Sequence, residues 1–210
     1  EFGQLFLGSV VGEFVRRYPT LQVEVELTTR VVDPVEEGVD IAIQLGRPQD
    51  SSLVARPMLL SPRQLFASPA YLEQYGIPQR PEDLVRHRCI HTLGDEGRKW
   101  HFHEPSVSIA VPQGVTVNNI TFAREAAVAG GGIINVPSFI AQPQVAEGKL
   151  VRVLEHCVLP STELYALYPS RRFQVMKVKA FIDYMMEQLE ERLNVRVEPN
   201  DEALVKLPNS

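Results

Sequence analysis

A stretch of seventeen residues, 28–44, constrains most strongly what this chain can fold into. It reads Thr-Thr-Arg-Val-Val-Asp-Pro-Val-Glu-Glu-Gly-Val-Asp-Ile-Ala-Ile-Gln. Asp33-Pro34 is typical of a helix start, since proline lacks the N–H that a first turn leaves unbonded, and Gly38 is typical of a helix end. The apolar run 41–43 then predicts a central parallel strand covered on both faces. Polar groups flank this strand, where the loops of an open α/β sheet bind small molecules, so the stretch predicts a ligand site.

Two periodic patterns precede this stretch. Apolar residues at steps of four, three and four predict one face of a helix that Pro19 ends. These residues are Leu7, Val11, Phe14 and Tyr18. Between Leu21 and Leu27, apolar and polar residues alternate, which predicts an edge strand with one wet side.

The rest of the chain alternates between strand and helix patterns. Strands are expected at 54–60, 64–67, 133–136, 150–154 and 164–168, and helices at 70–74, from Asn118-Asn119 to the glycines at 130–132, after Ser138, and at 175–193. This alternation predicts an α/β fold with two lobes joined near residues 67 and 163, and two such crossings form a hinge. Lobe I is then residues 1–66 plus 164–195, lobe II is residues 67–163, and residues 196–210 are a tail.

Composition excludes several classes of function. The net charge of −5 argues against a nucleic-acid grip by this segment, since phosphate binding needs clustered lysine and arginine. No apolar run approaches the roughly 20 residues needed to cross a bilayer, and the N-terminus lacks a secretion signal, so we expect a cytoplasmic protein with no membrane contact. Only Cys89 and Cys157 are present, without a CxxC, which predicts two unpaired thiols.

Several segments in order resemble one family. They are 30–43, Ser51-Ser52-Leu53-Val54-Ala55-Arg56, Ala67-Ser68-Pro69-Ala70-Tyr71-Leu72, Val117-Asn118-Asn119, 126–137, Gly148-Lys149-Leu150-Val151 and 164–182. Together they are similar to the effector-binding domain of LysR-type transcriptional regulators over roughly residues 2–190. The resemblance implies two Rossmann-like lobes joined by two crossover strands, like type II periplasmic binding proteins. It also implies an N-terminal winged helix-turn-helix that this chain does not contain.

The resemblance implies which residues bind the effector between the lobes. They are Thr28, Thr29 and Gln44 on lobe I, and Asn118, Asn119 and Val136 on lobe II. Hydroxyls and amides supply donors and acceptors, and a helix N-terminus attracts a carboxylate, so a small carboxylate or an aromatic acid would suit these residues, as would a neutral metabolite. The alternative for Thr28-Thr29 is a strand end bonded to its own backbone, and for Asn118 it is a plain helix cap.

The resemblance also implies a homodimer or homotetramer, with DNA bound only through the missing N-terminal domain. The candidate dimer residues are Val10, Phe14, Arg17, Phe122 and Ala126.

Other groups of residues give weaker evidence for phosphate, metal or catalytic sites. Gly130-Gly131-Gly132 follows a helix instead of opening one, so it indicates a helix stop and not a phosphate loop. His101 and His103 would share one face of a strand as metal ligands do, but no second pair accompanies them, so no metal or other cofactor is expected. No catalytic arrangement emerges, so we expect no enzyme. The alternatives are a transporter's solute-binding protein, which an upstream helix-turn-helix would exclude, and an enzyme of the same fold class.

Overall fold

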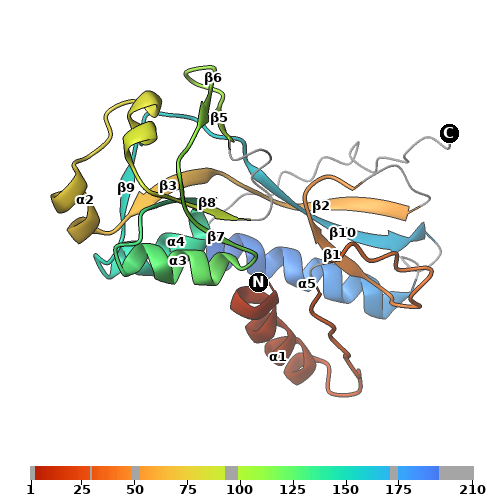
Figure 1. Cartoon of the computed structure of the whole chain (residues 1–210). Helices are drawn as coiled ribbons and strands as arrows, with labels where there is room; N and C mark the ends of the chain where they lie inside the picture. The colour runs from red at the N-terminus through yellow and green to blue at the C-terminus, as the bar shows by residue number, and fades with distance from the viewer. Residues whose placement is uncertain (1–2, 29, 49–52, 93–98, 171–174, 194–210) are drawn as a thin grey trace, which may run out of the picture. The chain divides into compact units, whose positions relative to one another are not determined.

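The structure of the chain is a computed structural model, shown in Figure 1, and it describes residues 3–28, 30–48, 53–92, 99–170 and 175–193. The chain divides into two compact units. Lobe I comprises Phe2–Leu60 and Thr162–Ser210, and lobe II comprises Ser61–Ser161. Residues 61–66 were predicted to belong to lobe I, but they lie in lobe II, because the strand at 63–67 pairs with two lobe II strands.

Lobe I is built on a three-stranded sheet in the order β1-β10-β2. The strands are β1 (Ala42–Leu45), β2 (Leu53–Ser61) and β10 (Thr162–Pro169), and β1 runs antiparallel to β10. A π-helical turn, η1 (Gly3–Leu7), leads into helix α1 (Gly8–Arg17), and α5 (Met176–Leu193) is the long C-terminal helix. The expected amphipathic pattern of α5 is confirmed at Val178, Ile182, Met185 and Leu189, which are all buried.

Helix α1 is held by α5 through an aromatic cluster. Phe14 is only 1% exposed, and its ring centroid lies 5.1 Å from that of Phe181 and 5.6 Å from that of Tyr184. Tyr18, at the end of α1, adds a third ring at 4.8 Å. Ring pairs at these separations stabilise a core beyond simple area burial, so α1 is anchored by its inward face.

Three predictions for the segment between α1 and β2 are wrong. Residues 21–28 form no regular secondary structure, and Val23, Val25 and Leu27 are exposed. An alternating sequence becomes a strand only where a neighbouring strand bonds its backbone, and no described strand pairs with this segment. Residues 34–38 form a turn instead of a helix, although Asp33 Oδ1 accepts the Val35 N–H at 2.7 Å as a cap would.

The third error concerns β1, which was predicted to be a central parallel strand. It is a half-buried edge strand of the described sheet, and its neighbour β10 is antiparallel to it. Three apolar residues in a row do not distinguish an edge strand from a central one.

Lobe II contains a five-stranded sheet in the order β7-β4-β8-β3-β9. The strands are β3 (Arg63–Ala67), β4 (Cys89–Thr92), β7 (Gln113–Val117), β8 (Ile133–Pro137) and β9 (Val151–Val153). Strand β4 is parallel to both β7 and β8, whereas β3 is antiparallel to β8 and β9. A separate hairpin is formed by β5 (Lys99–Phe102) and β6 (Val107–Ala110).

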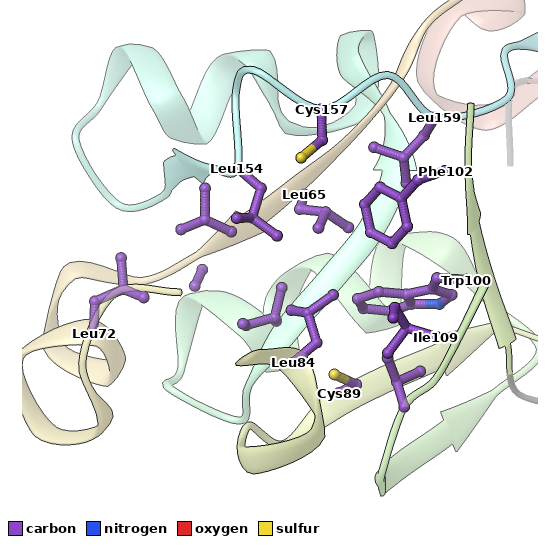
Figure 2. Packing of buried hydrophobic residues seen from close by; sticks show 14 of the residues in the cluster. Leu65, Leu72, Leu84, Cys89, Trp100, Phe102, Ile109, Leu154, Cys157 and Leu159 are labelled. Carbon is purple, nitrogen blue, oxygen red and sulfur yellow. The ribbon is translucent and has the colours of Figure 1, made fainter. Parts of the chain in front are cut away.

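Two hydrophobic clusters form the core of lobe II. One contains buried residues of α3 (Ile120–Val128) and α4 (Ser138–Ala146) with Phe66, Ile90 and Ile134 of the sheet. The other contains Leu84 of η2 (Pro81–Arg86) and residues of α2 (Pro69–Tyr75), with Trp100 and Phe102 of the hairpin (Figure 2). Cys89 and Cys157 both belong to this second cluster, and each is buried and not part of a disulfide.

Glycines at the end of α3 allow the chain to enter β8. Gly130 has a φ of +82°, which stops the helix as predicted. Gly132 has a φ of +142°, and a Cβ built on it would stand 2.4 Å from the carbonyl oxygen of Arg88. Only glycine fits there, because that separation is far inside van der Waals contact. The glycine run therefore allows the start of β8 to pass close to the backbone that enters β4.

The expected cap of α4 is wrong. Its N-cap residue is Pro137, and Ser138, the first helical residue, makes no side-chain capping bond. The strand β8 runs one residue further than the sequence pattern indicated, and this extension places Ser138 inside the helix.

Candidate functional site

An open pocket lies in lobe II where strand β7 ends and helix α3 begins. Its volume is about 510 Å³, and it is lined by Thr116, Val117, Asn118, Asn119 and Phe122. Strands β7, β4 and β8 run parallel, so their carboxyl ends share one edge of the sheet. The pocket therefore occupies the edge at which open α/β sheets bind ligands.

The local sequence explains how the pocket is shaped. Asn119 has an extended backbone and is the N-cap of α3, and its Oδ1 accepts the N–H of Phe122 at 2.7 Å. This bond satisfies one of the N–H groups that a first helical turn leaves unbonded. It also fixes the backbone of Phe122, whose side chain is 57% exposed beside the pocket. Asn119 and Phe122, which are three positions apart, thus supply the helix cap and an apolar wall of the pocket.

The pocket combines polar and apolar chemistry without a fixed charge. None of its five lining residues is ionisable. The carboxamide of Asn118 is exposed and offers both donors and an acceptor, while Phe122 and Val117 offer apolar contact. The positive end of the α3 dipole points to this place and favours an anion or a carbonyl oxygen. A small molecule with one polar head and one flat apolar part fits this arrangement.

The predicted lobe II residues fall in two places. Asn118 and Asn119 come together in the pocket. Val136 does not line it: its side chain is 0% exposed and belongs to the core cluster beneath α3 and α4. This prediction is therefore corrected, because a side chain buried in the core cannot contact a ligand unless the core opens. Thr116 was not predicted, and Phe122 was predicted only as a dimer residue, although a residue three positions after a cap lies beside that cap on a helix.

The predicted lobe I residues are described separately. Thr28 is exposed, and its Oγ1 accepts the N–H of Arg30 at 3.3 Å, the local backbone bond that was the alternative to ligand binding. Gln44 is half-buried in β1 and lies opposite Tyr165 of β10. Thr29 lies outside the described residues.

The predicted dimer residues also require correction. Val10 and Phe14 are 0% and 1% exposed and lie inside lobe I, so they cannot face a partner subunit while α1 keeps its packing. The helical period was read correctly, but the apolar face covers the chain's own core. Arg17 is exposed, 3.8 Å from Glu187, and stacks over the rings of Tyr18 and Tyr184. On α3, Phe122 is exposed and Ala126 is half-buried.

A network of polar side chains also links α1 to α5. Arg192 donates to Glu13 and to Ser9 Oγ, the latter at 2.7 Å, and the Tyr184 hydroxyl donates to Glu13 at 3.1 Å. Hydrogen bonds from Arg192 and Tyr184 lower the pKa of Glu13 below its ordinary value. Since these groups link the N-terminal and C-terminal helices of lobe I, they help to fix α1.

No group of three or more potential metal ligands occurs in the part of the chain that the structure describes. His101 Nδ1 lies 2.7 Å from Ser108 Oγ on the neighbouring strand of the hairpin. Among the described helices, none has the length and apolar composition that a membrane span requires.

Known proteins with similar sequences are transcriptional regulators. The chain is 32% identical over 194 residues to the HTH-type transcriptional regulator PtxR of Pseudomonas aeruginosa, covering 90% of this chain and 62% of PtxR. Among solved structures, the regulatory domain of CrgA, a LysR-type regulator from Neisseria meningitidis, matches with a TM-score of 0.80 and 26% identity. That match covers 90% of this chain and 94% of the CrgA domain.

The Vibrio cholerae virulence activator AphB, a member of the same class, matches with a TM-score of 0.78 and 25% identity. The match covers 89% of this chain and 65% of full-length AphB. The fold is therefore that of the ligand-binding regulatory domains, of type II periplasmic-binding-protein architecture, as the sequence indicated.

A family model also matches the chain, over residues 1–190. The chain belongs to the LysR substrate binding domain family. It spans about three fifths of the length of the regulators it matches, at 62% of PtxR. The comparisons do not favour a transporter solute-binding protein, the alternative left open by the sequence.

Proposed function

We propose that this chain is the effector-sensing domain of a LysR-type transcriptional regulator, and that the pocket at the start of α3 holds part of the effector. The observation that carries the proposal is the pocket itself, about 510 Å³, at the carboxyl edge of the lobe II sheet in a member of this family. Its volume lies within the roughly 300–1,000 Å³ that small-molecule sites occupy.

The chemistry of the pocket favours a small carboxylate with an apolar body. The N-terminus of α3 and the carboxamide of Asn118 suit the carboxylate, whereas Phe122 offers a ring face to an aromatic or aliphatic group. A neutral carbonyl compound would lack the full negative charge that the helix N-terminus favours. From the family resemblance, we further propose that Thr28, Thr29 and Gln44 contact the effector from lobe I.

The proposed mechanism is a shift between conformations of a larger protein. An effector changes the regulator only by the difference between its affinities for two arrangements, so binding without such a difference would be silent. We propose that the full-length protein is a cytoplasmic homodimer or homotetramer that binds DNA through a separate N-terminal domain, and that the domain releases its effector unchanged. Phe122 and Ala126 of α3, with Arg17 of α1, remain the candidate dimer surface.

A thermal-shift screen tests the proposal. The purified domain is melted with organic acids, aromatic acids and amino acids. A ligand at a hundredfold its Kd adds about 2.7 kcal/mol to the free energy of unfolding, which raises the Tm by several degrees. We expect Asn118→Ala to lose most of that shift. The matched control is Gln74→Ala, which removes an exposed carboxamide at the end of α2, outside the pocket, and should keep the shift.

The outcomes separate the two lobes. A hit that is lost in Asn118→Ala but retained in Thr28→Ala would confine the effector to the lobe II pocket. A hit unaffected by either variant would move the site elsewhere and refute the assignment. Mass spectrometry of the ligand after overnight incubation tests whether the domain transforms it, and a changed ligand would contradict a purely sensing role.

A further inference from the structure

A buried hydrogen bond joins helix α2 to the start of strand β4 in lobe II. The Tyr71 hydroxyl lies 3.2 Å from Nδ1 of His87, and both residues are buried. Tyr71 belongs to the middle of α2, while His87 follows η2 and precedes β4. The contact thus connects α2 to the start of β4, above the apolar cluster that both segments cover.

The neighbouring backbone assigns the proton of this bond. The N–H of Arg88 donates to the Tyr71 oxygen at 2.8 Å. The hydroxyl therefore accepts from Arg88, and it satisfies its own proton if that proton is donated to His87 Nδ1, whereas a proton on Nδ1 would leave the hydroxyl proton without this partner. An acceptor Nδ1 requires a neutral imidazole whose single proton is on Nε2. The arrangement thus favours a neutral His87 with its proton on Nε2.

The groups around the imidazole do not offset a positive charge strongly. Burial lowers the pKa of His87 below its ordinary value, while the Asp83 carboxylate of η2 opposes this shift to a smaller degree. The Arg88 guanidinium lies 5.2 Å from the ring centre of Tyr75, and the Cys89 thiol is 3.9 Å from the His87 carbonyl oxygen. The one acidic group is therefore outweighed by desolvation.

We propose that the Tyr71–His87 contact is an acid-labile latch that holds α2 against the start of β4. A proton added to Nδ1 turns the acceptor into a donor, so the hydroxyl proton loses its partner and a cation is left in an apolar cluster. Both effects weaken the attachment of α2. The stabilisation is fully present above about pH 6.5, the ordinary value for histidine, and is lost as the pH falls through the lower folded pKa.

Nuclear magnetic resonance and hydrogen exchange test the latch in the intact domain. The imidazole nitrogen shifts of His87 at pH 7.5 should report a proton on Nε2 alone. Between pH 7.5 and pH 5, the protection factors of α2 amides, corrected for intrinsic exchange, should fall about five- to tenfold, as expected when one neutral hydrogen bond is lost. Protection in α4, which packs on the other face of the sheet, should change much less.

Three variants make the result decisive. His87→Asn keeps an acceptor near the Nδ1 position but does not titrate, so α2 protection should become independent of pH. Tyr71→Phe should give low α2 protection at both pH values, and His101→Asn, which changes an exposed histidine of the hairpin, should behave like the wild type. An Nδ1-protonated tautomer at pH 7.5 would overturn the proposal. So would α2 protection that is unchanged between the two pH values, or a pH effect that persists in His87→Asn.

Discussion

Phe14 gives the sharpest test of how lobe I is assembled. The substitution Phe14→Ala removes a ring that is 1% exposed and that lies within 5.6 Å, centroid to centroid, of three other aromatic rings. Truncating a buried phenylalanine typically costs about 3–5 kcal/mol, and aromatic pairing places this site toward the upper end. Since domains of this size are stable by about 5–15 kcal/mol, the variant should lose a third or more of its stability.

The matched control is Phe122→Ala, the same chemical change on another helix. Because the Phe122 side chain is 57% exposed within one chain, its removal should alter the unfolding free energy of the monomer by about 0.5 kcal/mol or less. Both variants are unfolded in urea and followed by circular dichroism at two protein concentrations tenfold apart. The Phe14→Ala loss should be the same at both concentrations, since it arises within one chain.

Two results would refute the reasoning. A Phe14→Ala variant as stable as the wild type would mean that α1 does not pack on α5 through this ring. A loss of unfolding free energy that appears at only one protein concentration would indicate that Phe14 lies in a subunit interface. Sedimentation of Phe122→Ala completes the comparison, because weakened self-association in that variant alone would support α3 as the dimer surface.

Two further stability predictions concern lobe II. Asn119→Ala should cost about 1 kcal/mol in thermal or urea unfolding through loss of the α3 cap, and Asn119→Asp should restore most of it, so an equal loss in both would argue against capping. Gly132→Ala should cost more than about 1 kcal/mol, since the new Cβ would meet the Arg88 carbonyl and the φ is positive. Its counterpart Gly12→Ala, on an exposed turn of α1 with open space around the Cβ, should gain about 0.5–1 kcal/mol, and a reversed order would contradict both arguments.

The parts of the fold that the sequence predicted well are those with a local cause. The Asn119 cap, the glycine stop after α3 and the buried stripe of α5 each depend on residues within one or two turns of chain. The two-lobe division and the family followed from the order of many short segments. The boundary at 61–66 was misplaced because it depends on which strands β3 joins, and that is a long-range choice.

The errors share a physical origin in pairing and burial. Leu21 to Leu27 has the alternation of a strand, but alternation does not supply the neighbour that a strand needs. Val10, Phe14 and Val136 were recognised as apolar and important, yet a sequence does not tell a face that packs inward from one that meets a ligand or a partner. For the pocket, the family resemblance pointed to Asn118 and Asn119, which line it, and the cap at Asn119 has a sequence signature of its own, whereas neither kind of signal marks Thr116.

The two lobes differ in how their chain segments are ordered, and this difference has a consequence for biosynthesis. Lobe II is one uninterrupted stretch, Ser61–Ser161, so we expect its sheet to form while the ribosome is still adding later residues. Lobe I can fold only later, because β10 and α5 are its last segments to be synthesised and β10 is the middle strand of its sheet. A nascent chain stalled before β10 would therefore expose the apolar faces of α1 and β2 for as long as translation pauses. We expect chaperones to bind the N-terminal third of the chain during such a pause.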